Sequence, residues 1–91
     1  MQIFLKKFGT TLTSRQAGKE AYLALQPLLK GLQQNEKITV DFDGVITFSP
    51  SWGDEFLTPL RNNYPHNIEL SPSNNPSVMV TLELMKEIWS P

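Results

Sequence analysis

The chain has 91 residues, no Cys, one His and a formal net charge of −1, from 8 Lys and Arg against 9 Asp and Glu. A chain of this length forms one small domain, which we place at residues 1–91, with little room for a deep substrate cavity. Because the sequence carries no basic stripe, its composition argues against a nucleic-acid binder. The usual Cys and His ligands of zinc are lacking, so we expect neither a metal nor another cofactor.

The first residues, through Phe8, lack the apolar stretch of about 7–15 residues that precedes a signal-peptide cleavage site. No part of the sequence approaches the roughly 18 consecutive apolar residues that a membrane-spanning helix needs. Lys6 and Lys7 form the only adjacent basic pair, which is a weak signal for a membrane surface. We therefore expect a cytoplasmic protein that does not associate with a membrane.

The first element that the sequence predicts is a strand over residues 3–8, ending at Gly9. A polar entry segment follows, in which Thr13 and Gln16 have the spacing of a capping box and predict a helix start. The helical period then runs from Arg15 to about Gln34. Its predicted apolar face consists of Ala17, Ala21, Ala24, Leu25, Leu28 and Leu32. Pro27 lies within this pattern and predicts a kink or a short break.

Residues 38–42 predict a second strand, followed by the Asp43-Gly44 turn and an extended segment that ends at Phe48. Ser49 and Pro50 then have the residue types of an N-cap and a first helical position. The face of this second helix consists of Phe56, Leu57 and Leu60. Pro59 predicts that the helix is short or irregular.

A turn cluster over residues 62–65 leads to a third short strand at residues 67–70, and a polar loop covers residues 71–77. Residues 78–89 fit both an alternating strand and a helix. The Asn-Pro pair before them and their length favour the helix. The predicted order is therefore β-α-β-α-β-α, which implies a small α/β domain with a mostly parallel or mixed sheet and helices packed against it.

Residues 38–45, Ile-Thr-Val-Asp-Phe-Asp-Gly-Val, resemble the first motif of haloacid-dehalogenase-type phosphatases. The resemblance implies a Mg²⁺-dependent phosphohydrolase with Asp41 as nucleophile and Asp43 as general acid. Such chemistry also needs a phosphate-binding Lys and further acidic ligands later in the chain. The only later Lys is Lys86, on the predicted terminal helix, and no Asp follows Asp54. The phosphohydrolase is therefore the alternative hypothesis, and the leading one follows below. If Asp41 is not a nucleophile, we expect it to have a structural role as a partly buried, paired carboxylate.

A second resemblance covers residues 8–60, with a tail at residues 68–88. The chain resembles the STAS-like domain of unknown function of bacteria and phages at matching positions in both halves. These positions are Gly9, Leu12, Ser14, Arg15, Ala17, Asp41, Phe42, Gly44, Val45, Phe48 and the run Gly53 to Leu57. Because many offsets agree at once, we take the STAS-like domain as the leading interpretation.

STAS-like domains are similar to anti-sigma-factor antagonists, which bind a GHKL-type ATPase that acts as a kinase. The resemblance implies a non-enzymatic regulatory module that presents residues 49–55 to such a protein partner. Ser51 aligns with the serine that is phosphorylated in antagonists. The antagonist sequence Asp-Ser-Ser-Gly is replaced here by Ser49, Pro50, Ser51 and Trp52. The two nearby carboxylates, Asp54 and Glu55, would also repel a phosphate on Ser51.

The predicted partner-binding residues are Ser49, Trp52, Asp54, Glu55 and Arg15. Trp52 is either an interface anchor or a core residue. Asp54 and Glu55 either face the partner or complement the N-terminus of their helix. Arg15 either pairs with one of these carboxylates, or contacts a ligand phosphate, or is solvated. The oligomeric state is left open by the sequence.

Overall fold

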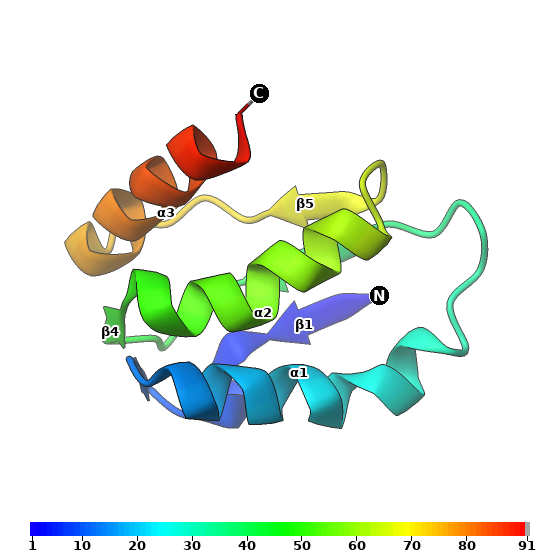
Figure 1. Ribbon diagram of the computed structural model, residues 1–91, viewed down its shortest axis with the longest axis horizontal. Coiled ribbons are helices and arrows are strands. Elements are labelled where there is room, and N and C mark those ends of the chain that lie inside the picture. The colour runs from blue at the N-terminus through cyan, green and yellow to red at the C-terminus, as the bar shows by residue number, and fades with distance from the viewer. Residues whose placement is uncertain (91) are drawn as a thin grey trace.

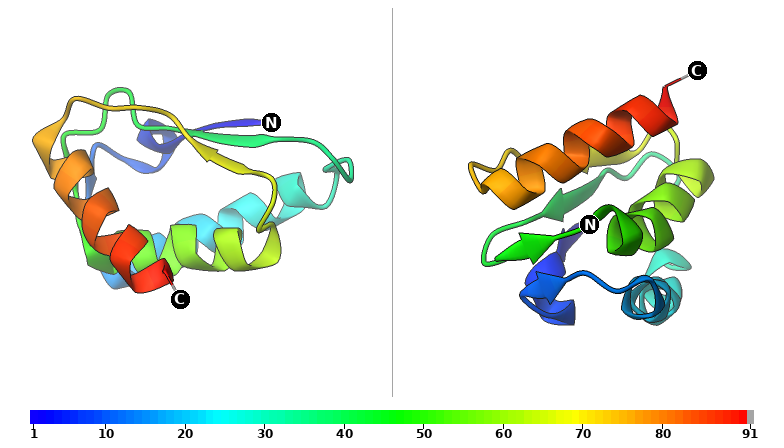
Figure 2. Two further views of the ribbon diagram at one scale, coloured as in Figure 1. Left: turned by 90° about the horizontal axis from the view of Figure 1, so that it is seen from above. Right: turned by 60° about the vertical axis from the view of Figure 1, so that its left-hand side comes forward.

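The computed structural model describes residues 1–90 as three helices packed with short parallel strands (Figure 1). Seen from above, α1 and α2 lie side by side along one face of the strands, and α3 crosses beside them (Figure 2, left). The prediction of a small α/β domain is confirmed. The elements are β1 (Gln2–Phe4), a 3-10 helix (Leu5–Phe8), β2 (Thr11–Leu12), α1 (Arg15–Leu29), β3 (Ile38–Asp41), β4 (Thr47–Phe48), α2 (Pro50–Asn63), β5 (Ile68–Leu70) and α3 (Pro76–Trp89).

The main sheet has three strands in the order β1-β3-β5, all parallel, and β2 pairs with β4 in a second parallel ladder. Ile3 pairs with Val40, and Ile38 pairs with Ile68. Ile3, Ile38 and Val40 are buried, whereas Gln2 and Glu69 are exposed. Since side chains alternate along a strand, the sheet buries one face under the helices and leaves the other open.

The predicted strand over residues 3–8 is wrong beyond Phe4, where the chain turns into the 3-10 helix. Leu5 is fully buried and Phe8 half-buried, while Lys6 and Lys7 between them are exposed. Burial three residues apart fits a 3-10 turn and does not fit a strand. Gly9 then reverses the chain at a φ of 129°, which favours glycine, and β2 follows within the predicted polar segment.

The start of α1 also differs from the prediction. Ser14 is the N-cap, because its Oγ accepts the Ala17 N–H at 3.0 Å. Gln16 donates its side-chain amide to Glu20 instead of reaching back, so the predicted capping box does not form. The helix ends at Leu29 instead of near residue 34.

The buried face of α1 is rotated from the predicted one. Ala17, Ala24 and Leu28 are exposed. Pro27 lies inside the last turn of α1, and the helix ends two residues after it, at Leu29. Since Pro has no N–H, it cannot donate to the carbonyl four residues earlier. The buried residues of α1 are Gly18, Ala21, Leu25 and Leu29.

The start of α2 is confirmed, with Ser49 as N-cap and Pro50 as first helical residue. The Ser49 Oγ accepts the Trp52 N–H at 3.4 Å and donates to the Thr13 carbonyl oxygen at 2.8 Å. This hydroxyl therefore caps α2 and fastens it to the segment that precedes α1. Pro59 does not shorten α2, which continues to Asn63.

The helical interpretation of residues 78–89 is confirmed, since α3 spans Pro76–Trp89. Asn75 is its N-cap and accepts the N–H groups of Ser77 and Val78. The Asn75 side-chain amide donates to the carbonyl oxygens of Val45 and Ile46, which fixes the helix start to the segment before β4. Within residues 1–90, no helix is long and apolar enough to cross a membrane.

Two glycines allow the helices to approach closely. A Cβ on Gly18 would lie 2.5 Å from the Trp52 carbonyl oxygen, so α1 contacts the backbone of α2 there. A Cβ on Gly53 would lie 2.6 Å from the Met85 Sδ, so α3 rests on α2 at that position. Beneath these contacts, the rings of Trp52 and Phe56 stack with their centroids 4.9 Å apart. The start of α2 is therefore held by α1, by α3 and by the aromatic core.

Candidate functional site

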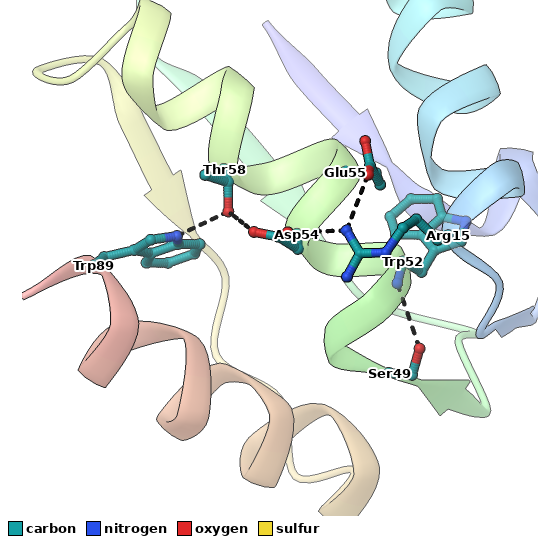
Figure 3. Close-up of polar contacts among 7 residues, drawn as sticks. All are labelled: Arg15, Ser49, Trp52, Asp54, Glu55, Thr58 and Trp89. Atoms are coloured by element: carbon teal, nitrogen blue, oxygen red, sulfur yellow. Dashed lines mark hydrogen bonds and ion pairs between the residues drawn. The ribbon is translucent and has the colours of Figure 1, made fainter.

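The predicted site residues lie around the first two turns of α2 (Figure 3). Arg15 is the first residue of α1, and its guanidinium reaches across to α2. Its Nη1 donates to Asp54 Oδ2 at 3.0 Å and to Glu55 Oε1 at 2.9 Å. The predicted pairing of Arg15 is confirmed, and it involves both carboxylates at once.

The electrostatics of this triad follow from the hydrogen bonds. The Glu55 and Asp54 carboxylates raise the pKa of Arg15 further above neutrality. Hydrogen bonds from Arg15, and next from Thr58, hold the pKa of Asp54 below its ordinary value. The Arg15 and Asp54 side chains are about half exposed, at 56% and 47%. An ion pair this exposed contributes little to stability, so its main effect is to order the surface.

The triad extends to α3 through a second pair of hydrogen bonds. Thr58 Oγ1 donates to Asp54 Oδ1 at 3.0 Å and accepts the Trp89 Nε1–H at 3.0 Å. We call Arg15, Asp54, Glu55, Thr58 and Trp89 the polar network; it joins all three helices (Figure 3). The sequence analysis missed Thr58, although its i,i+4 spacing from Asp54 was a usable signal. Trp89 gave no such signal, because only the fold brings it near.

Trp52 lies in the core and is 1% exposed. It occupies the inner side of α2, where it stacks on Phe56 and contacts Phe48 and Phe8. The prediction that Trp52 anchors a partner is therefore wrong for this structure, and the alternative of a core residue is right. The surface that remains at the helix start is polar.

Asp54 and Glu55 do not complement the N-terminus of α2, because its first turn contains no acidic residue. The dipole effect is confined to that first turn. Both carboxylates are oriented by Arg15 instead. Of the two interpretations of these residues, the one in which they face a partner is consistent with their positions.

Ser51 is half-buried at the second position of α2. Ser49 uses its hydroxyl for capping, whereas the Ser51 hydroxyl makes no side-chain hydrogen bond to any residue from 1 to 90. Pro50 has no N–H, and the N–H groups of Trp52 and Gly53 bond to the Ser49 side chain and carbonyl. Of the two serines at this helix start, Ser51 is therefore the one whose hydroxyl is not used for capping.

The Asp-x-Asp-Gly segment forms a turn. Asp41 Oδ1 accepts the Asp43 N–H at 2.9 Å, and Asp41 Oδ2 accepts the Gln2 side-chain amide at 3.1 Å. Asp43 is 81% exposed and lies 3.8 Å from the Lys6 ammonium. Gly44 follows with a φ of 84°. The part of the chain that the structure describes has no group of three or more His, Cys, Asp or Glu side chains placed to hold a metal ion.

Comparison with known proteins identifies the family. A family model described as a STAS-like domain of unknown function matches residues 25–77, more than half of the chain. The matched segment contains β3, β4, α2 and β5, and therefore includes Ser51, Asp54 and Glu55. No curated protein and no solved structure matches the chain. The parallel strands with packed helices agree with the family match, and the chain belongs to the STAS-like domains of unknown function.

Proposed function

We propose that the protein is a non-enzymatic regulatory module that binds a protein partner through the start of α2. We call this the α2-start surface and define it as Arg15, Ser49, Ser51, Asp54 and Glu55. The observation that supports it is that Arg15 Nη1 binds the carboxylates of both Asp54 and Glu55, which are 47% and 29% exposed, and so holds them in one geometry. Such a pair adds little to folding stability but gives a partner a fixed charge pattern to recognise.

The proposed partner is a GHKL-type ATPase that acts as a kinase in the cytoplasm. The support is the likeness of STAS-like domains to anti-sigma-factor antagonists, whose equivalent loop contacts such an ATPase. In this chain the loop leads from β4 directly into α2, and its backbone is fixed by the Ser49 hydroxyl and the aromatic core. Because the loop is rigid and its polar side chains are at the surface, a kinase partner can reach Ser51 in one fixed position.

We propose Ser51 as the residue that this kinase modifies. A phosphate adds about −1.5 to −2 charges, and the helix N-terminus stabilises an anion by about 0.3–1 kcal/mol when exposed. Asp54 and Glu55 oppose the phosphate, but Arg15 neutralises one of their two charges. A phosphate on Ser51 would therefore compete with the Asp54 and Glu55 carboxylates for the Arg15 guanidinium. It would also change the charge of the surface that the partner binds.

The binding proposal is tested by measuring affinity for purified GHKL-type ATPases, starting with any that is encoded beside this chain. We expect Arg15→Ala and Asp54→Ala to weaken binding by about tenfold or more, since each removes a charge from the recognised pattern. Lys30→Ala, an exposed change on the far end of α1, is the control and should bind normally. Unchanged affinity in both surface variants rejects the α2-start surface.

Phosphorylation is tested separately, by incubating the protein with the ATPase and ATP and measuring intact mass. The expected result is the mass of one phosphate on the wild-type chain and none on Ser51→Ala. Ser49→Ala is the matched control, and should still be modified after allowing for its weaker helix cap. Labelling that persists in Ser51→Ala rejects Ser51 as the acceptor.

A further inference from the structure

A groove lies between β5 and α3, and Trp89 of the polar network lines it. In the view from above, β5 and α3 diverge from the loop that connects them (Figure 2, left). One hollow, of about 410 Å³, is lined by Leu57, Arg61, Ile68, Leu70, Lys86 and Trp89, among others. A second, of about 360 Å³, is lined by Leu70, Val78, Leu82, Glu83 and Lys86, among others. Leu70 and Lys86 line both hollows, which therefore adjoin, and we call the two together the β5–α3 groove.

The groove has an apolar floor and a cationic end. Arg61 and Lys86 are exposed, and neither forms an ion pair with a carboxylate of residues 1–90. The Arg61 guanidinium lies over the Trp89 ring, 5.1 Å from its centroid, which holds the charge at the rim of the first hollow. No acidic side chain lines that hollow, whereas Glu83 lines the second one, so the carboxylate of a ligand belongs at the first. Its chemistry therefore complements a ligand that carries a carboxylate beside apolar groups.

The other wall of the groove is the free edge of a sheet. Within residues 1–90, β5 pairs with β3 and with no other strand, so its outer backbone groups are unpaired. Ile68 and Leu70 are in register with the buried Ile38 and Val40, and so they point to the helix side of the sheet. An extended chain added to this edge would place every second side chain on that side, about 7 Å apart. Those side chains would enter the two hollows.

We propose that the β5–α3 groove binds an extended, acidic peptide segment of a partner protein, which adds to β5 as a fourth strand. Its backbone pairs with the outer groups of β5, and a carboxylate of the peptide meets Arg61 and Lys86. Its alternate side chains occupy the apolar hollows. Peptide binding by strand addition uses main-chain hydrogen bonds for affinity and side-chain pockets for specificity. This groove shares no residue with the α2-start surface, although Thr58 links its Trp89 to Asp54. The proposal does not rest on the partner proposed for the α2-start surface.

The probe is a phage-displayed library of random peptides, selected on the wild-type protein and counter-selected on an Arg61→Glu/Lys86→Glu double variant. We expect enriched peptides with an acidic residue next to, or two positions from, an aliphatic residue. When synthesised, they should bind the wild type at least about tenfold more tightly than the double variant. Lys30→Glu, which reverses a cation away from the groove, should bind as the wild type does. The double variant must retain wild-type urea unfolding, so that lost binding reports the groove.

Strand addition is tested on the same peptides by amide hydrogen exchange and by N-methylation of the peptide backbone. We expect slower exchange at Ile68 and Leu70 in the complex, and loss of binding when the peptide amides that face β5 are methylated. Failure to enrich any peptide, enrichment of basic peptides, or protection confined to other segments overturns the proposal. Binding that survives N-methylation overturns strand addition, and equal competition by a small carboxylate such as benzoate assigns the groove to small anions.

Discussion

Gly18→Ala changes the one position where the α1 helix must approach the backbone of α2. The added Cβ would lie 2.5 Å from the Trp52 carbonyl oxygen and 3.0 Å from the Trp52 Cα. Ordinary contacts of this kind are about 3.5 Å or longer, so the helices must separate by about 1 Å. Trp52 cannot relieve the clash by rotating its side chain, because the atoms concerned belong to the backbone.

The change in the free energy of unfolding on Gly18→Ala is the balance of two opposing effects. Replacing a helical Gly by Ala favours the helix by about 0.8–1 kcal/mol. Overpacking a tight interface costs about 1–3 kcal/mol and occasionally more. Because this clash is backbone to side chain in a buried contact, we place it at the upper end of that range. Gly18→Ala should therefore lower the free energy of unfolding by about 1–2 kcal/mol, and move Arg15 away from its carboxylate partners.

Urea unfolding followed by tryptophan fluorescence measures this change. A fall of about 1–2 kcal/mol corresponds to a midpoint lower by about 1 M for a small protein. Gly31→Ala is the matched control, because its Cβ would meet nothing closer than the Leu28 carbonyl oxygen at 3.8 Å. It should change stability by no more than about 0.5 kcal/mol. If Gly18→Ala is as stable as the wild type or more so, the close approach of α1 and α2 is refuted.

Three further predictions concern the polar network and the acidic turn. Because the folded-state pKa of Asp54 is lowered, its contribution to stability is present above about pH 4, the ordinary pKa of Asp, and is lost as the pH falls through the lowered folded-state pKa. Asp54→Asn should therefore destabilise the protein at pH 7, and by progressively less as the pH is lowered below about 4, in urea unfolding at each pH. Trp89→Phe removes the donor to Thr58 and should cost about 0.5–1.5 kcal/mol, whereas the same substitution in a Thr58→Val background should cost less. The wild type and Asp41→Asn should both hydrolyse p-nitrophenyl phosphate with Mg²⁺ no faster than the background rate. Activity in the wild type that disappears in Asp41→Asn would contradict a non-enzymatic module.

Local signals explain which elements were predictable. Ser49-Pro50 and Asn75-Pro76 begin helices for a local reason. The side chain of the N-cap residue accepts a backbone N–H of the first helical turn. Pro suits the first helical position, where no N–H is needed. In both cases the information lies in short-range chemistry. The pairing of Arg15 with Asp54 and Glu55 was one of three alternatives left open, because these residues are 39 and 40 positions apart and only the fold brings them together.

What the sequence could not predict depends on contacts between distant segments. The helical period did indicate Ala21 and Leu25 of the buried face of α1. The burial of Gly18 on that face depends on the close approach of α2, and a glycine carries no hydrophobic signal. The burial of Trp52 reflects the aromatic side chains that surround it, which come from several elements. The bond from Trp89 to Thr58 joins residues 31 positions apart. No periodicity along the chain could indicate any of these.

The proposed binding surface is most directly tested by hydrogen–deuterium exchange of the protein alone and in complex with a GHKL-type ATPase. The account predicts that the complex slows exchange most strongly at residues 49–55 and at the start of α1, where Arg15 lies. The open face of the sheet, marked by Gln2 and Glu69, should exchange equally in both samples. Protection of that open face, with residues 49–55 unaffected, would contradict the account.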